Sequence, residues 1–281
     1  MLIPFISFSA GGESVIVDFH VHPYINNGAG KNFSVKDYWT LEFCRYALKY
    51  LRLEAGARKV CSYLESRLKP RGINFCVLSA AELRLIDMIK AIVDLRPDLF
   101  MGFCTVDPHS PDVDVQLARR VKLDGFRGLK AHSLMQSFRP PDVPKLWEAV
   151  SKLKITVLAH GGKIWVNDPD YANPAYYNEV LDTYPFTLVV AHMGGNYTRE
   201  AVELAKKFDS VYLETSGATK KRIMYALERL GCERIVYGSD VPYIPWGDPI
   251  NEIEKIKSLP IKEGEKERIL GENAREILRL K

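Results

Sequence analysis

Two histidines that end an apolar run are the first residues in this chain whose types and spacing suggest chemistry. His20 and His22 stand two positions apart at the end of 15–21, a run rich in β-branched and apolar residues that predicts a buried strand. Because side chains alternate along a strand, both imidazoles are expected on one face with Asp18 behind them, and Phe19 on the other face. Such a pair either binds a metal or forms hydrogen-bonded core histidines. The residue types at the ends of the later strands distinguish these two interpretations.

The elements that position these histidines follow a regular alternation of strand and helix from residue 72 onward. Near-continuous apolar runs such as 187–191 indicate strands that are buried on both faces, as in parallel sheets. The later strands are expected at 73–79, 99–106, 126–131, 155–160, 186–192, 211–215 and 235–240, and the helices at 82–95, after Ser110-Pro111, at 144–153, after Asn173-Pro174, and at 199–207, 219–230, 250–257 and 265–280. Eight β/α units in one domain, 1–281, predict an α/β fold that closes as a (β/α)8 TIM barrel.

A helical insertion, 24–70, follows the first strand directly. Its pattern predicts one helix from Asp37 and a second helix divided from it by Gly56. An insertion at this place would rise over a site built at the end of the first strand, so a lid is expected; an ordinary crossover helix with an extra turn is the alternative. The loop 24–32 contains Gly-Ala-Gly-Lys, but it lacks the spacing of a P-loop and opens no helix directly.

The C-terminal ends of the predicted strands carry polar residues, and in a barrel this is where the chemistry takes place. After His20 and His22 on the first strand come Lys130 and His132 on the fourth, His160 on the fifth, His192 on the sixth, Glu214 on the seventh and Asp240 on the eighth. Of the six histidines, only His109 stands elsewhere, in the loop after the third strand. This joint placement favours a metal over core histidines. Imidazoles with one or two carboxylates suit zinc, or else iron or manganese, with a water in an open position whose pKa falls toward ~7.

The composition is that of a soluble globular protein. Of its 281 residues, 47% are hydrophobic and 26% charged, and the net charge of +4 is mild, with basic clusters such as Lys206-Lys207 in helix-like segments. No nucleic-acid ligand is therefore expected. Five cysteines without C-x-x-C spacing favour a reducing compartment, and no apolar run reaches the ~20 residues of a membrane span. A cytoplasmic protein is expected, whose first ten residues add an edge strand or plug the barrel floor.

Six short motifs and the C-terminal helix resemble the amidohydrolase superfamily, in particular the amidohydrolase-related branch that includes aminocarboxymuconate-semialdehyde decarboxylase. The motifs are Asp18-Phe-His20-Val-His22, Gly128-Leu-Lys130-Ala-His132, Val157-Leu-Ala-His160-Gly-Gly, Val190-Ala-His192-Met-Gly-Gly, Tyr212-Leu-Glu214-Thr-Ser-Gly and Tyr237-Gly-Ser-Asp240-Val-Pro, and the final helix is 269–278. The resemblance runs from about residue 15 to 280 and leaves the insertion unmatched.

The resemblance implies a mononuclear metal centre. One divalent metal, expected to be Zn²⁺, would be held by His20, His22, His160 and Asp240. Asp240 would also accept a proton from the metal's water, and His192 beside it would polarise a substrate carbonyl or shuttle a proton. Asp18 and Glu214 are expected to orient imidazole N–H groups rather than to ligate the metal themselves.

Lys130 has two interpretations. In binuclear branches of the superfamily, a lysine that ends the fourth strand is carbamylated and bridges two metals, whereas in the branch resembled here it usually is not. An unmodified Lys130 is therefore expected. Arg127, Lys130 and His132 would then meet a substrate carboxylate. Trp165 and Tyr243, in the loops after the fifth and eighth strands, would supply apolar walls.

Two enzymatic functions fit this site. The first is hydrolysis of a small amide, lactone or ester by a metal-bound hydroxide. The second is nonoxidative decarboxylation of an aromatic or unsaturated acid, which an arginine of the insertion, Arg45 or Arg52, pointed at the metal would favour. A metal-dependent deoxyribonuclease is a weaker alternative because the charge is dispersed, and a non-catalytic metal protein conflicts with an open water position. A small-molecule substrate is expected, with neither nucleic acid nor membrane as partner, and a homodimer is compatible with the sequence.

Overall fold

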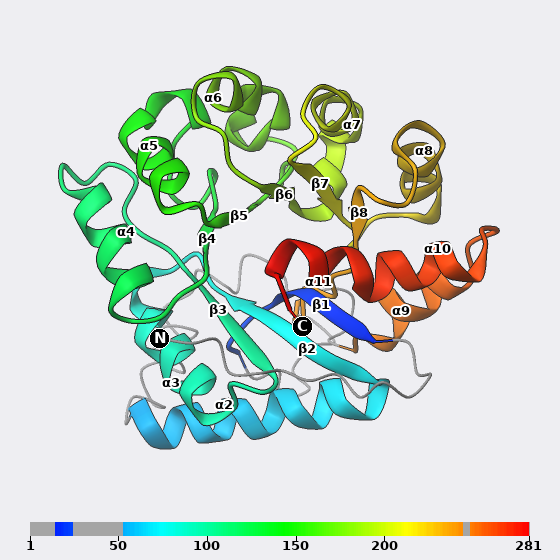
Figure 1. The fold of residues 1–281 in the computed structure, drawn as a ribbon, viewed down its shortest axis with the longest axis horizontal. Coiled ribbons are helices and arrows are strands. Elements are labelled where there is room, and N and C mark those ends of the chain that lie inside the picture. Colours follow the sequence, from blue (N-terminus) through cyan, green and yellow to red (C-terminus); the bar gives the residue numbers. More distant parts are fainter. Residues whose placement is uncertain (1–14, 25–52, 244–247, 281) are drawn as a thin grey trace.

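The computed structural model describes residues 15–24, 53–243 and 248–280, whose strands form one parallel sheet in chain order (Figure 1). The strands are β1 (Ile16–Val21), β2 (Ile73–Ser79), β3 (Phe100–Cys104), β4 (Gly128–Ala131), β5 (Thr156–Ala159), β6 (Leu188–Val190), β7 (Val211–Glu214) and β8 (Ile235–Val236). β8 returns to β1: the backbone N–H of Phe19 donates to the carbonyl of Tyr237 at 3.0 Å, and that of His22 to Val241 at 2.8 Å. The predicted (β/α)8 TIM barrel is confirmed.

Helices surround the strands (Figure 1). They are α2 (Leu53–Leu68), α3 (Ile86–Leu95), α4 (Val113–Lys122), α5 (Pro144–Leu153), α6 (Tyr177–Thr183), α7 (Thr198–Lys207), α8 (Lys220–Leu230), α9 (Ile250–Lys257), α10 (Glu263–Glu267) and α11 (Asn273–Leu278). Helix α7 shows why these segments are helical, because Ala201, Leu204 and Ala205 are buried on one side while Lys206 and Lys207 are exposed. None of the described helices is long and apolar enough to cross a membrane.

Helix α2 contains Gly56, so the expected division of the insertion at this glycine is wrong. The buried stripe of α2 includes Ala57, Val60, Leu64 and Leu68, and the helix packs against α3 in the outer ring. Burial of this stripe outweighs the cost of about 1 kcal/mol of a glycine inside a helix. The remainder of the proposed lid, with its first helix, Arg45 and Arg52, lies outside the described residues, as does the expected role of the first ten residues.

The interior of the barrel is a packed apolar core below the C-terminal ends of the strands. It contains Val17, Phe19, Phe75, Val77, Met101, Phe103, Leu158, Val189 and Val236, and α11 adds Ala274 and Leu278. A core filled in this way leaves the open end of the barrel as the place for a site. The four cysteines in the described part of the chain are free and buried, as core thiols would be.

A β-bulge in β1 changes the expected face of Asp18. Asp18 pairs with Cys76 of β2 and Val21 pairs with Leu78, so three steps along β1 correspond to two steps along β2. Cys76 and Leu78 share one face of β2, and both belong to the apolar layer between strands and helices. Asp18 and Val21 therefore both face this outer layer. The prediction that Asp18 lies behind the two histidines on their face is wrong.

The same bulge turns Phe19 inward. Its ring lies 5.9 Å from that of Phe103 in an edge-to-face contact inside the barrel, whereas Val21 packs in the outer layer. The expectation that Phe19 faces the covering helices is therefore wrong as well. The bulge leaves His20 and His22 on the inner face, at the open end of the barrel.

Candidate metal centre and substrate cavity

A cavity of about 280 Å³ lies at the C-terminal ends of the strands. Its size is near the lower end of the range for small-molecule sites. Eight of the residues singled out in the sequence line it, namely His20, His22, Lys130, His132, His160, His192, Asp240 and Tyr243. These eight residues come from the C-terminal ends of five strands, β1, β4, β5, β6 and β8, so distant parts of the chain meet at one place, as the barrel topology predicts.

Three potential ligand atoms converge at the base of this cavity. Nε2 of His22 lies 3.1 Å from Nε2 of His20 and 2.8 Å from Oδ1 of Asp240, and Nε2 of His20 lies 3.5 Å from the same oxygen. All three side chains are buried. Two atoms that are each ~2.1 Å from one tetrahedral ion lie about 3.4 Å apart, so these separations fit ligands of a single cation.

Lys130 is a buried cation beside these atoms. Its Nζ lies 2.7 Å from Nε2 of His20, and its side chain is 1% exposed. Burial lowers the pKa of Lys130 to about 8, although the negative charges of Asp240 and Glu214 act to raise it. A primary amine in this position can donate a hydrogen bond to an acidic group held in the cavity.

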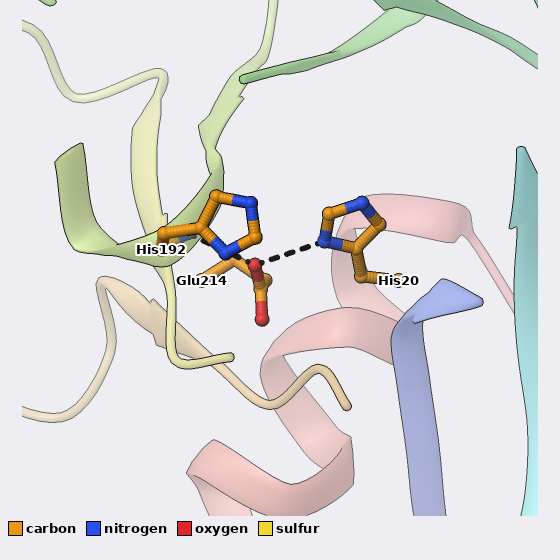
Figure 2. A group of neighbouring side chains, drawn as sticks. All are labelled: His20, His192 and Glu214. Carbon is orange, nitrogen blue, oxygen red and sulfur yellow. Dashed lines mark hydrogen bonds and ion pairs between the residues drawn. The ribbon is translucent and has the colours of Figure 1, made fainter. Parts of the chain in front are cut away.

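Glu214 fixes the orientation of two histidines (Figure 2). Its Oε2 accepts from Nδ1 of His20 at 3.3 Å and from the backbone N–H of His192 at 3.1 Å, while both N–H and O–H of Ser216 donate to the carboxylate. Since Nδ1 of His20 carries the proton, its Nε2 presents a lone pair to the cavity. The predicted role of Glu214 as an orienting residue for an imidazole N–H matches this geometry.

His192 is held in an unusual backbone conformation. Its φ of 57° is left-handed, as are those of the following Met193, Gly194 and Gly195. Nδ1 of His192 lies 2.9 Å from Oγ of Ser216, and because that hydroxyl already donates to Glu214, it accepts the proton of Nδ1. The Nε2 lone pair therefore remains for the cavity. Asp240 also has a positive φ, of 56°, and strain of this kind is typical of functional residues.

His160 and His132 form a stacked pair on another wall. Their ring centroids lie 4.0 Å apart with the planes 9° from parallel, and the ring of His160 lies 5.0 Å from that of His192. Nε2 of His160 is buried without a hydrogen-bond partner among the described residues. A buried nitrogen with no partner is costly unless a ligand or an ion satisfies it.

These donors fit a divalent cation. Burial lowers the pKa values of His20, His132 and His160 well below their usual range, and it lowers that of His192 as well, so the imidazoles are neutral near pH 7. Neutral imidazole is the form that binds metal. The lone pair of His20 and the carboxylate of Asp240 face each other at 3.5 Å, an arrangement of two acceptors that a cation between them stabilises.

Comparison with known proteins identifies the family. The family model described as amidohydrolase matches residues 68–280. The chain belongs to the amidohydrolase family. The resemblance found in the strand-end motifs is thus confirmed, and this amidohydrolase is an enzyme with the fold of metal-dependent amidohydrolases. Family membership and the cluster of His20, His22 and Asp240 together support a single divalent metal.

Solved structures similar to this amidohydrolase share its barrel at low identity. A dihydroxybenzoic acid decarboxylase from Polaromonas, with bound manganese and an inhibitor, is 17% identical with a TM-score of 0.69, over 95% of this chain and 98% of that one. A 5-carboxyvanillate decarboxylase from Sphingomonas paucimobilis is 17% identical, with a TM-score of 0.67 over 96% and 100%. A probable 2-pyrone-4,6-dicarboxylic acid hydrolase from Acinetobacter baumannii is 21% identical, with a TM-score of 0.64 over 94% and 99%. No curated protein sequence matches.

Two residues expected in the site of this amidohydrolase lie elsewhere. Arg127 precedes β4, is exposed, and borders a different cavity with Phe75 and Phe100, at the N-terminal ends of the strands. Three residues along a strand span about 10 Å, so Arg127 cannot act beside Lys130. Trp165 is 44% exposed and does not line the cavity; its neighbour Ile164 does. In contrast to the expectation, neither Arg127 nor Trp165 lines the cavity that contains the histidines.

Asp18 of the amidohydrolase orients backbone rather than imidazole. Its Oδ1 accepts from the backbone N–H groups of His20 at 3.1 Å and of Ser239 at 2.9 Å, which joins β1 to the turn that carries Asp240. Burial raises the pKa of Asp18 to about 7. The expected contact with an imidazole N–H is wrong because the bulge in β1 places Asp18 on the outer face.

Sequence reasoning missed three functional-site residues. Ser216 holds His192 and Glu214, Glu82 lines the cavity after β2, and Lys163 lines it after β5. Ser216 stands within the quoted Tyr212-Leu-Glu214-Thr-Ser-Gly motif, and Lys163 directly follows His160-Gly-Gly, so their places beside strand ends were available as a signal. Glu82 stands three residues after the predicted strand 73–79, so the same signal was present for it.

Proposed function

We propose that this amidohydrolase is a metal-dependent nonoxidative decarboxylase of a small aromatic or unsaturated carboxylic acid. The observation that carries the proposal is the buried Lys130 beside the cluster of His20, His22 and Asp240. An acidic substrate needs a cation at the base of its cavity, whereas a neutral amide or ester does not. Several similar structures, including the two decarboxylases described above, also favour this reaction over hydrolysis.

We further propose the ligand set His20, His22, His160 and Asp240 for the single metal. The convergence of three of these side chains and the buried, unpartnered Nε2 of His160 support it. When bound, the metal supplies a positive charge that stabilises anionic substrate and developing negative charge. Zinc remains the expected ion for histidine-rich sites, with manganese as the alternative because similar decarboxylases contain it.

The chain's own residues then perform proton transfer. Asp240 or His192 first takes up a proton from solvent and then delivers it to the substrate carbon that bears the carboxylate. The carbon–carbon bond breaks, its electron pair returns to the substrate, and carbon dioxide leaves, so one proton replaces one carboxylate and no redox partner is needed. Lys130 and His132 hold the acidic group, and the ring of Tyr243, 4.6 Å from that of His22, forms an apolar wall.

Hydrolysis of a small lactone, amide or ester is the second candidate. It is favoured by the similarity to the probable 2-pyrone-4,6-dicarboxylic acid hydrolase, the highest identity of the three structures described. The same residues serve both reactions, because the carboxylate of Asp240 or the Nε2 lone pair of His192 can take a proton from an attacking water.

One experiment distinguishes the two reactions. Metal-loaded protein is incubated in deuterium oxide with hydroxybenzoates, carboxyvanillate and 2-pyrone-4,6-dicarboxylate, and products are followed by mass spectrometry. Decarboxylation predicts release of carbon dioxide and a product with one deuterium on the former carboxyl-bearing carbon. Ring opening of the pyrone without loss of carbon dioxide would instead establish the hydrolase. The expected lid role of 24–70, a homodimer and the absence of a nucleic-acid ligand remain predictions.

A further inference from the structure

Lys163 is a cation in the wall of the cavity that has no ion-pair partner in the described part of the chain. It is half-buried and lines the cavity together with Gly161, Ile164 and Gly195. No carboxylate among the described residues lies within ion-pair distance of its Nζ. A half-buried ammonium that faces a cavity without a counter-ion is positioned to bind an anion.

The backbone of Lys163 is held rigidly by its surroundings. A Cβ added at Gly162 would lie 2.8 Å from Cα of Gly195 and 2.9 Å from the carbonyl oxygen of Gly194. The backbone next to Lys163 is therefore in direct contact with the backbone of these two glycines. The backbone N–H of Lys163 donates to Oδ1 of Asn196 at 2.8 Å. The side chain of Lys163 therefore starts from a fixed backbone, so binding of a ligand by the ammonium orders the side chain but no loop.

The other charges of the cavity already have partners. Among the described residues that line it, the charged side chains are Lys130, Lys163, Glu82 and Asp240. Oε1 of Glu82 accepts from the hydroxyl of Tyr24 at 2.5 Å, and Lys130 contacts His20. Two lysines balance the two carboxylates that line the cavity, and Glu214 lies behind His20, so a divalent metal would leave the site with a net positive charge. Such a cavity favours an anionic ligand, and Lys163 stands apart from Lys130 as a second cation for it.

We infer that Lys163 binds a second acidic group of the substrate, so that the enzyme prefers dicarboxylates to monocarboxylates. The inference rests on the proposed function, since it assigns Lys130 and the metal centre to one carboxylate and Lys163 to another. Lys163 is thus a specificity-determining residue on the wall of the cavity. Its contribution is to substrate affinity rather than to proton transfer.

The test measures binding of benzoate, isophthalate and terephthalate to the metal-loaded protein by isothermal titration calorimetry. We expect at least one dicarboxylate to bind about tenfold more tightly than benzoate, as one charged hydrogen bond in a partly buried site predicts. Lys163→Met should remove this preference and leave benzoate affinity within about twofold, and Lys163→Arg should retain it. Lys220→Met is the matched control, because Lys220 is exposed at the start of α8 and does not line the cavity.

The outcomes separate this inference from the proposed function. If the wild-type protein binds benzoate but shows no preference for either dicarboxylate, or if Lys163→Met keeps the preference, the role of Lys163 is refuted while an acidic substrate stands. If the wild-type protein binds none of the three acids, the proposed acid substrate fails and the inference fails with it. A preference that weakens as salt is raised supports charge pairing by Lys163.

Discussion

Glu214 at the end of β7 accepts the Nδ1 proton of His20 at the end of β1, at 3.3 Å. This contact decides which nitrogen of His20 faces the cavity, because a proton on Nδ1 leaves the lone pair on Nε2. Gly238 allows the contact: a Cβ there would lie 2.2 Å from Oε1 of Glu214. Burial raises the pKa of Glu214 to about 7, and the hydrogen bonds from Ser216 and His192 oppose this rise.

Glu214→Gln should weaken metal binding about 10- to 100-fold, the usual effect of removing a carboxylate that orients a metal-binding histidine. Metal affinity is measured by competition with a chelator. Asp18→Asn is the matched control: Asp18 is equally buried, but it contacts backbone N–H groups, so its substitution should lower stability and leave metal affinity within about twofold. Equal loss of metal affinity in both variants would contradict the separate roles.

His20→Ala, His22→Ala and His160→Ala should each lose metal while the barrel still folds, because each removes a donor at the rim and leaves the apolar core intact. Metal content by mass spectrometry and circular dichroism check the two parts. His109→Ala serves as control, since His109 is exposed and contacts the carbonyl of Gln136. Full metal occupancy in two of the three variants would refute the ligand set.

Asp240→Asn should keep the fold and lower turnover by about 10²-fold or more in the metal-loaded protein, the scale of a positioned acid or base. The amide oxygen can still ligate, but the side chain can no longer carry the proton. Turnover is measured on protein whose metal content equals that of the wild type. A turnover number near that of the wild type would assign proton transfer to His192 alone.

Lys130 should be unmodified, with one metal per chain. Its amine lies 2.7 Å from Nε2 of His20 and contributes a hydrogen bond, whereas a carbamate would supply an anionic bridge for a second metal. Native mass spectrometry of the metal-loaded protein checks both points in one measurement. Two metals per chain, together with the added mass of one carbon dioxide, would indicate a binuclear hydrolase.

Gly161→Ala should destabilise the protein by about 2 kcal/mol and reduce activity, because overpacking against backbone forces the chain to shift. Its Cβ would lie 2.6 Å from the carbonyl oxygen of Ala191 and 2.8 Å from Cα of Gly194, in the segments that carry His160 and His192. Urea denaturation gives the free energy of unfolding. Gly264→Ala is the control: nothing lies within 4 Å of its added Cβ, so helix propensity should stabilise the protein by about 0.5 kcal/mol.

Patterns along the sequence were enough to predict the barrel and to indicate that histidines and carboxylates gather at one end of it. Periodicity of apolar residues is a local property, and it located the strands and most helices, with β2, α5 and α9 at their observed bounds. Parallel strands of a barrel all end on one side, so residues such as His160, His192 and Asp240 had to meet once the strands were identified. No contact information was needed for that step.

Which side chains reach the cavity depends on contacts between distant parts of the chain. The bulge in β1 arises from pairing with β2, more than 50 residues away, and it moves Asp18 to the outer face. Arg127 precedes β4 and therefore lies at the other end of the barrel from the cavity. Lys163 lines the cavity because the backbone at Gly161-Gly162 packs against the backbone at Gly194-Gly195. The register between strands and the close contacts between backbone segments depend on residues distant in sequence. They cannot be predicted from the pattern of residues along one strand.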